Sequence, residues 1–280
     1  MTGANQGLGQ AIADRFVASG AHVLLAARGV DRLRQVEDEL RRNARPGQVV
    51  ASHAGDVSRP EDCQAIVSKA LATLPGLTIL VNNAGVYGPI GRIVDNDWEQ
   101  WVQAIQINLF GTVLMCRALL PHLRAQGYGK IINLSGGGAT APLPRFSSYA
   151  TSKAAIVRFT ETLAEEVRGD RIDVNAIAPG ALNTRLLDQV LEAGPERAGQ
   201  GFYERSLKQR EQGGAPLDKG AALAAFLASE ASDGITGRLL SAVWDNWTEL
   251  PGRQQHLAKS DIYTLRRIVP EDRGQKWQCA

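Results

Sequence analysis

The sequence predicts an α/β protein in which a parallel β-sheet carries helices on both faces. Two observations lead to this prediction. Short, continuously apolar segments such as AHVLLAA (21–27) and LTILV (77–81) are typical of strands buried on both sides. They alternate with longer stretches whose apolar side chains recur at helical spacing, which is the pattern of βαβ units.

The expected elements keep this alternation along the chain. Residues 7–19 place Leu8, Ile12 and Phe16 on one helical face, and Gly20 is a natural stop. Further helices are expected at 30–43, 58–74, 97–126, 149–168 and 216–229, and strands at 21–27, 48–54, 77–81, 130–135, 171–178 and 238–243. Residues 1–243 therefore form a single domain, with a polar, glycine-bearing insert at 182–214 that covers a pocket and a tail at 244–280.

Composition excludes several classes of protein. Of the 280 residues, 44% are hydrophobic and 21% charged, which is ordinary for a soluble enzyme. The net charge is +2 and basic residues alternate with acidic ones, so neither nucleic acid nor a membrane is expected as a partner. No apolar run is expected to span a bilayer, and the first residues do not resemble a signal peptide.

Cysteine and histidine usage gives no metal site. Cys63, Cys116 and Cys279 are widely spaced and odd in number, so they form neither a disulfide framework nor a ligand cluster. The histidines are scattered along the chain. A reducing cytoplasm is the expected location.

The chain opens with a candidate phosphate-binding turn, TGANQGLG (2–9). Gly3, Gly7 and Gly9 let the backbone turn tightly and approach a pyrophosphate, which then meets the positive end of the helix that begins near Leu8. Taken alone, the same spacing also fits a simple turn and helix cap.

Arg28 directly follows the second expected strand, in LLAARG. An acidic residue at this place would accept hydrogen bonds from a ribose 2′-hydroxyl, whereas a guanidinium suits a 2′-phosphate. The position favours NADP(H) and leaves NAD(H) possible. The alternative is that Arg28 is a solvated loop charge.

Tyr149 and Lys153 lie four residues apart and therefore share one face of the helix expected at 149–168. A neighbouring ammonium and an oxidised nicotinamide would both favour the phenolate and lower the pKa of Tyr149. The tyrosine could then exchange a proton with a carbonyl or alcohol oxygen. Such a pair is also common on ordinary amphipathic helices.

Four motifs occur in one order: TGANQGLG at 2–9, NNAG at 82–85, YATSK at 149–153 and PGALNT at 179–184. Together they resemble the short-chain dehydrogenase/reductase family across residues 2–243. The resemblance implies a Rossmann-type doubly wound sheet. It also implies hydride transfer between a nicotinamide cofactor and a carbonyl or alcohol carbon.

The resemblance also assigns roles to residues. Tyr149 is the acid/base, Lys153 activates it and holds the nicotinamide ribose, and Asn108 supports a water relay; otherwise Asn108 is a buried amide at a helix kink. Asp56 and Val57 would line the adenine, and Asn83, Ala84 and Gly85 the adenosine ribose. The implied cofactor-binding set is Gly3, Asn5, Gly7, Leu8, Gly9, Arg28, Asp56, Val57, Asn83, Ala84, Gly85, Tyr149, Lys153, Pro179, Gly180 and Thr184.

The family's catalytic serine has no clear counterpart. It usually lies about thirteen residues before the tyrosine, and here that position is Gly136. We take Ser135 as the candidate that orients the substrate, with Thr140 as a substitute donor. Since an oxyanion-type donor contributes orders of magnitude in rate, this position bears directly on function.

Three expectations remain. By resemblance, the helices at 97–126 and 149–168 pack between subunits of a homodimer or homotetramer.

The alternatives to a small-molecule oxidoreductase are a dinucleotide-binding sensor or scaffold without turnover, and a dehydratase or epimerase. Finally, Met1 stands where the family often has the last residue of a central strand. We expect that strand to lie upstream; a chain that lacks it is the alternative.

Overall fold

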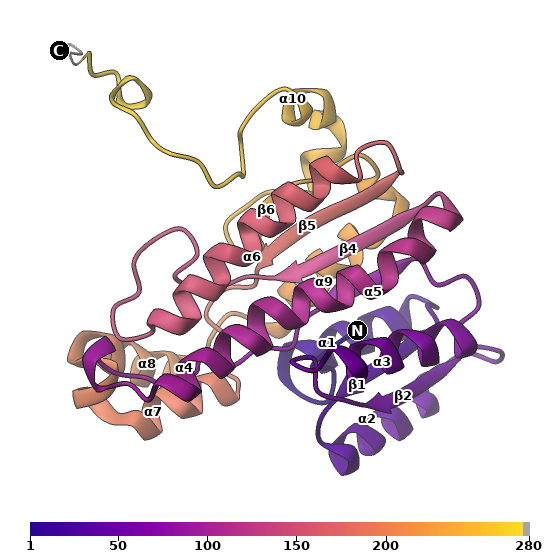
Figure 1. The fold of residues 1–280 in the computed structure, drawn as a ribbon, viewed down its shortest axis with the longest axis horizontal. Helices are drawn as coiled ribbons and strands as arrows, with labels where there is room; N and C mark the ends of the chain where they lie inside the picture. Colours follow the sequence, from indigo (N-terminus) through magenta and orange to yellow (C-terminus); the bar gives the residue numbers. More distant parts are fainter. Residues whose placement is uncertain (277–280) are drawn as a thin grey trace.

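The computed structural model describes residues 1–276 and confirms the α/β class (Figure 1). The first half contains α1 (Gly7–Ala18), β1 (Val23–Ala27), α2 (Val30–Asn43), β2 (Val50–Ala54), α3 (Pro60–Thr73), β3 (Ile79–Asn82), α4 (Trp98–Ile105), a π-helical segment (Gln106–Phe110) and α5 (Gly111–Gln126). The second half contains β4 (Gly129–Leu134), α6 (Ser147–Glu166), β5 (Ile172–Ala178), α7 (Arg185–Ala198), α8 (Gln200–Gln212), α9 (Leu217–Leu227), β6 (Leu239–Ser241) and α10 (Gln254–Ala258).

The strands form two parallel sheets, a pair β1–β2 and a four-stranded sheet in the order β3–β4–β5–β6. Met1 and Thr2 lie between the two sheets and bond to both. The N–H of Thr2 donates to the carbonyl of Val81 at 3.0 Å, and the N–H of Ala26 donates to the carbonyl of Met1 at 2.9 Å. An apolar cavity of about 250 Å³ is lined by Met1 and by residues of β1 and β3.

Helices cover both faces of the sheets, and each face has its own apolar core. On one face α1, α2 and α9 bury Ile12, Leu33 and Leu223. On the other face α3 and α5 bury Ile66 and Leu123 together with residues of α6. β1 is buried along its whole length because it is covered on both sides, which explains the unbroken apolar run in its sequence.

The segment at 182–214, expected as a polar insert, is largely helical. It folds into α7 and α8, which pack against each other. Leu187 and Val190 bury the inner side of α7, and most other side chains of the pair are partly or fully exposed. Gly194 and Gly199 adopt positive φ at the bends. The polar composition of the segment reflects this exposed surface.

The tail leaves the sheet after β6 and returns to it. The N–H of Leu239 donates to the carbonyl of Tyr263 at 2.8 Å, so the tail pairs with the edge strand. Trp247 packs against Phe226 with ring centroids 5.3 Å apart, whereas Trp244 is 85% exposed. Residues 277–280, including Cys279, lie outside the described part of the chain.

One helical stretch, Trp98–Gln126, is long and apolar enough to cross a bilayer by length and composition. The sequence had been expected to hold no such stretch. In the structure α5 contacts α3 and β4, and α4 contacts α6. The buried apolar side chains of this stretch therefore belong to the protein core.

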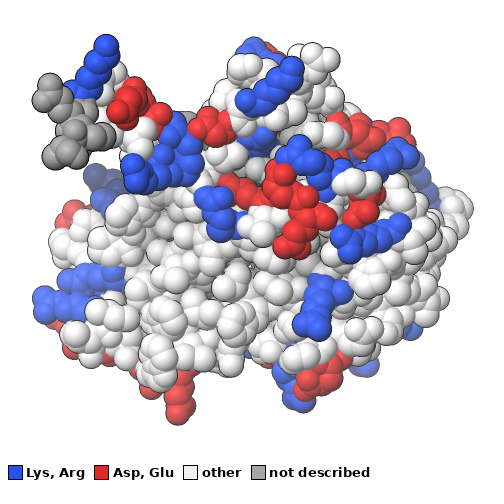
Figure 2. Space-filling model, turned by 45° about the horizontal axis from the view of Figure 1, so that its top comes forward, with Lys and Arg blue, Asp and Glu red and all other residues white. Residues whose placement is uncertain are grey.

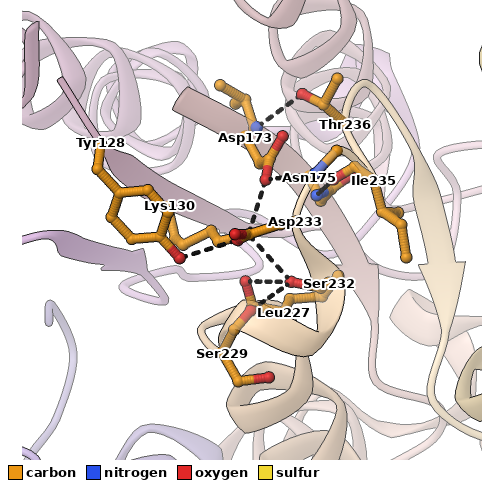
Figure 3. A network of polar contacts seen from close by, with 12 residues as sticks. Tyr128, Lys130, Asp173, Asn175, Leu227, Ser229, Ser232, Asp233, Ile235 and Thr236 are labelled. Carbon is orange, nitrogen blue, oxygen red and sulfur yellow. Dashed lines mark hydrogen bonds and ion pairs between the residues drawn. The ribbon is translucent and has the colours of Figure 1, made fainter. Parts of the chain in front are cut away.

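A buried ion network joins the sheet to the turn after α9 (Figure 3). The Lys130 side chain on β4 is fully buried, and its Nζ lies 2.7 Å from a carboxylate oxygen of Asp173 and 2.7 Å from one of Asp233. The hydroxyl of Tyr128 donates to Asp233 at 2.9 Å. Each buried charge thus has a partner, which burial requires.

Replacing Lys130 with Met should lower the free energy of unfolding by about 3 kcal/mol, because it leaves Asp173 facing Asp233 without a cation. Chemical denaturation followed by circular dichroism measures the change. The matched control is Lys69→Met on the exposed side of α3, which should change stability by less than about 0.5 kcal/mol. Equal stability of the two variants would contradict a stabilising role for the network.

Candidate active site

A cavity of about 700 Å³ lies where β1, β3, β4 and β5 end. This is the edge at which open parallel sheets bind ligands. It brings together the following residues predicted from sequence: Gly3, Asn5, Gly7, Leu8, Gly9, Arg28, Asp56, Val57, Asn83, Ala84, Gly85, Ser135, Tyr149, Lys153, Pro179 and Thr184. Asn108 and Gly180 are not part of its wall.

The glycine-rich turn forms one end of the cavity. Gly3 has φ +61°, and a Cβ there would lie 2.8 Å from the Cα of Ala84. A Cβ on Gly9 would lie 2.1 Å from the carbonyl oxygen of Gly3. No side chain fits at either position, so the backbone itself lines the cavity at the N-terminus of α1, where a helix favours anions. The turn therefore fits a pyrophosphate.

Thr2 and Asn83 hold this turn against the end of β3. The hydroxyl of Thr2 accepts from the N–H of Asn83 at 3.1 Å and from that of Ala84 at 3.2 Å. The Asn83 amide donates to the carbonyls of Thr2 and Gly3 at 3.1 and 2.9 Å. Asn83 is thus a structural link between two walls of the cavity as well as one of its lining residues.

Arg28 and Asp56 meet at the end of β1 and β2. Their nearest charged atoms are 3.7 Å apart, and the Arg28 side chain is 53% exposed. Burial alone would raise the pKa of Asp56, but hydrogen bonds from Ser58 and the charges of Arg28 and Arg59 outweigh it and lower the pKa. Arg28 therefore keeps a free, solvent-facing side from which it can reach an anion.

Tyr149 and Lys153 lie on α6 and also line the cavity. Both are buried, and the Lys153 ammonium lies 5.6 Å from the centroid of the Tyr149 ring. The Lys153 Nζ donates to the carbonyl of Leu134 at 2.7 Å. The end of β4 thus fixes the lysine beside the tyrosine.

Burial dominates the ionisation of this pair. It raises the pKa of Tyr149 well above its ordinary value, with Tyr87 adding to the effect, and it lowers the pKa of Lys153 to about 8. The sequence predicted that Lys153 would lower the pKa of Tyr149, but in the protein alone the pKa is raised. Desolvation outweighs the attraction of the single ammonium, so formation of the phenolate needs further positive charge nearby.

Asn108 lies directly behind this pair, in the π-helical segment between α4 and α5. Its amide oxygen accepts from the N–H of Val86 at 2.8 Å, and its Nδ2 donates to the hydroxyl of Ser152 at 2.9 Å. That hydroxyl donates to the carbonyl of Tyr149 at 2.8 Å. Asn108 therefore ties the segment after β3 to the first turns of α6, and a π-bulge is frequent at functional sites.

The assignment of Ser135 as the substrate-orienting donor is not supported by the geometry. Its hydroxyl donates to the carbonyl of Lys153 at 3.2 Å and so serves the packing of α6 on β4. The next residue, Gly136, faces the hydroxyl of Tyr149, and a Cβ at Gly136 would lie 2.6 Å from that oxygen. Thr140 is exposed on the following loop. Side chains of successive residues in an extended strand point to opposite faces, so Gly136 faces Tyr149 and the adjacent Ser135 faces away from it.

Gly180 directly follows the lining residue Pro179, and charged residues of α7 and α8 line the cavity. Gly180, with φ +92°, packs its backbone against Val243 and shapes the loop after β5. Arg185, Asp188 and Arg210 from α7 and α8 line the cavity, and Asp188 pairs with Arg210. The sequence placed the 182–214 segment over a pocket but did not single out these charges.

Among residues 1–276 no group of three or more His, Cys, Asp or Glu is arranged to hold a metal.

Comparison with known proteins agrees with this geometry. The family model described as short chain dehydrogenase matches residues 1–194. The chain belongs to this family. It is 33% identical over 237 residues to dehydrogenase/reductase SDR family member 4 of Sus scrofa, with 85% of this chain and 82% of that protein covered. It is 37% identical over 243 residues to 3beta-hydroxysteroid dehydrogenase 1 of Eggerthella lenta, covering 86% and 89%.

Solved structures of the family superimpose on the chain. A levodione reductase aligns with a TM-score of 0.79 and 26% identity, covering 90% of this chain and 96% of that one. An NAD⁺-bound xylitol dehydrogenase aligns at 0.78 and 27%, covering 86% and 95%. An actinorhodin polyketide ketoreductase with NADPH aligns at 0.77 and 27%, covering 86% and 93%. The short-chain dehydrogenase is therefore an NAD(P)-dependent oxidoreductase with a Rossmann-type fold.

Replacing Gly136 with Ala should lower kcat about 100-fold, because the new Cβ displaces the Tyr149 hydroxyl, and a shift of about 1 Å at a reacting group has this cost. Gly137→Ala is the matched control, since a Cβ there meets nothing within 4 Å. Steady-state kinetics on both variants checks the prediction. If the two variants were equally active, the hydroxyl would not depend on the space at position 136.

Proposed function

We propose that this short-chain dehydrogenase transfers hydride between NADP(H) and a small carbonyl or alcohol substrate, with Tyr149 as the acid/base. One observation carries the proposal. A single cavity is lined by the glycine turn and Arg28 and also by Tyr149 and Lys153. NADP(H) has its 2′-phosphate on the adenosine half, its pyrophosphate in the middle and its nicotinamide on the other half, so one bound cofactor could contact all of these residues.

The residues present fit such a cofactor. The Gly3–Gly9 turn would take the pyrophosphate, Asp56 and Val57 the adenine, and Pro179 and Thr184 the nicotinamide end. When bound, the nicotinamide supplies or accepts the hydride. Tyr149 holds the proton that the substrate oxygen gains or loses, and Lys153 stabilises its phenolate.

The preference for NADP(H) rests on Arg28. It follows the strand whose end meets the adenosine ribose in Rossmann-type folds, and no acidic side chain stands in its place. Its exposed guanidinium can form charge-assisted hydrogen bonds with a 2′-phosphate. Relatives of the family bind either cofactor: the xylitol dehydrogenase contains NAD⁺ and the ketoreductase NADPH.

The substrate is proposed as a ketone or its secondary alcohol. Several similar proteins are named for such pairs: a hydroxysteroid dehydrogenase, a xylitol dehydrogenase and a ketoreductase. Gly136 makes a second reading worth testing, in which the chain binds the dinucleotide as a sensor or scaffold without turnover. A dehydratase or epimerase would use the same residues without net oxidation of the cofactor.

Assembly into a homodimer or homotetramer through α4, α5 and α6 remains our proposal. Trp98 and Phe110, in the helical run from α4 to α5, are 67% and 51% exposed, and Trp98 stacks on Trp101. Figure 2 shows a broad face with few charged side chains that is bordered by charged ones. Large exposed apolar side chains of this kind mark contact surfaces.

The cytoplasm is the proposed location, in keeping with the free thiols of Cys63 and Cys116.

Replacing Arg28 with Gln should weaken NADPH binding roughly 10- to 100-fold and leave NADH binding unchanged, because charge-assisted hydrogen bonds to the 2′-phosphate are lost. Fluorescence titration with each cofactor measures both dissociation constants. Arg34→Gln, on the exposed side of α2, is the control. An equal loss for NADH and NADPH would refute the role of Arg28 in reading the phosphate.

Replacing Tyr149 with Phe should lower kcat by about 10²- to 10⁴-fold while NADPH still binds, since only the proton-exchanging hydroxyl is removed. The assay follows NADPH oxidation with a panel comprising a 3-ketosteroid, a cyclic diketone and a keto sugar. Tyr263→Phe in the tail is the control. Undiminished turnover by the Tyr149 variant would show that another group moves the proton. Tight NADPH binding without turnover of any ketone would favour the sensor.

A further inference from the structure

Arg145 has a backbone conformation that is unfavourable for a residue with a side chain. Its φ is +73°, and among residues 1–276 the other non-glycine residues with a positive φ are Arg171 and Tyr263. Such a conformation costs free energy in an L-residue and persists only where the surrounding structure holds it. Glycine would adopt it without this cost, so the strain directs attention to what the Arg145 side chain does.

The Arg145 guanidinium binds the end of α7. Its Nη1 donates to the carbonyl of Glu196 and, at 3.3 Å, to the carbonyl of Arg197. The last carbonyls of a helix have no partner within the helix, and a basic side chain can satisfy them. The Arg145 side chain also lies against Gly199, where a Cβ would be 3.1 Å from its Cδ. One arginine thus holds the turn that joins α7 to α8.

The backbone of Arg145 is joined to the helix that carries Tyr149. It precedes Phe146, after which α6 begins, and Tyr149 follows three residues later. Phe146 is fully buried, and its ring packs against that of Phe202 in α8 with centroids 4.8 Å apart. The Arg145 carbonyl accepts from the N–H of Gly91 at 2.9 Å. Arg145 therefore also fixes the start of α6 to the segment that follows β3.

Arg197 connects the same segments in the other direction. Its Nε donates to the carbonyl of Ile90 at 3.0 Å, in the segment that also binds the Arg145 backbone. The segment after β3, the start of α6 and the end of α7 therefore meet at two arginines. Gly194 and Gly199, both with positive φ, flank the turn at 195–198. Because glycine is conformationally free, the position of this turn depends on the contacts of the two arginines.

The first turns of α7 lie at the cavity, which they line with Arg185, Leu186, Asp188 and Gln189. Arg145 does not line the cavity and can act on it only through α7. We propose that Arg145 is a positioning residue, which holds α7 and α8 closed over the cavity and in place relative to Tyr149. Its effect on turnover rests on the proposed function, whereas its effect on the position of α7 does not.

A pair of matched variants of the 280-residue chain tests the proposal. Arg145→Gly removes the guanidinium and relieves the backbone strain. Arg171→Gly makes the same exchange at φ +53° in the turn before β5, and the Arg171 guanidinium lies over the ring of Tyr128 rather than at α7. Strain relief opposes the loss of hydrogen bonds, so the Tm of Arg145→Gly should stay within about 3 °C of the wild type.

Limited proteolysis reads the position of the turn directly. Trypsin should cleave after Arg197 about tenfold faster in Arg145→Gly than in the wild type, because cleavage requires the turn to open locally. Mass spectrometry at early times identifies the fragments 1–197 and 198–280. Arg171→Gly should leave the rate of this cleavage unchanged.

Steady-state kinetics reads the effect on the reaction. With NADPH and a ketone that the wild type reduces, Arg145→Gly should lower kcat/KM about tenfold, because an open α7 no longer encloses the substrate. Arg145→Lys keeps a cationic donor at the end of α7 and should recover part of this loss. A purely structural role would instead lower the Tm and leave kcat/KM of the folded enzyme unchanged.

Faster cleavage after Arg197 together with a reduced kcat/KM, in Arg145→Gly alone, supports the proposal. It is overturned if either quantity is unchanged in Arg145→Gly, or if Arg171→Gly shows the same changes. If the wild type reduces no ketone, the proposed function fails, and the cleavage rates alone decide whether Arg145 holds α7.

Discussion

The structure depends on the hydrogen bonds by which Met1 and Thr2 connect two sheets that share no continuous strand. Met1 bonds to β1 and Thr2 bonds to the last residues of β3. The Thr2 hydroxyl accepts two further N–H groups from the segment that begins at Asn83. The glycine turn follows directly. Its position in the cavity is therefore set by these few bonds.

The catalytic side of the cavity is built differently. Tyr149 and Lys153 lie on a long helix that packs on β5 and on the π-helical segment. Ser135, Ser152 and Asn108 all use their polar groups to fix this helix from behind. The pair is thus buried and held by several hydrogen bonds, and burial opposes ionisation of the tyrosine. Rigid placement benefits catalysis because little reorganisation is needed when the reaction occurs.

Most elements could be predicted from the sequence because their signals are local. Apolar runs such as residues 23–27 and the helical spacing of Leu33, Val36 and Leu40 need no tertiary information. All the site residues predicted from the sequence except Asn108 and Gly180 line the cavity. The helices α7 and α8 were not predicted as helices, since their exposed surfaces give a polar composition typical of loops.

The sequence is least informative about the site where the outcome depends on geometry finer than a motif. Ser135 and Gly136 are neighbours, and only the strand register determines which of them faces Tyr149. The pKa of Tyr149 depends on how completely it is desolvated, which the spacing to Lys153 does not reveal. Arg185 and Arg210 belong to different helices, and their shared position at the cavity follows from how α7 packs on α8.

Hydrogen–deuterium exchange with and without NADPH tests the central claim, that one dinucleotide site spans the glycine turn, the NNAG segment and the Tyr149 helix. Exchange at residues 3–9, 83–85 and 149–153 should be slower when NADPH is present, and exchange at β6 should be unchanged. Slower exchange confined to another surface, or no change in these three segments, would contradict it.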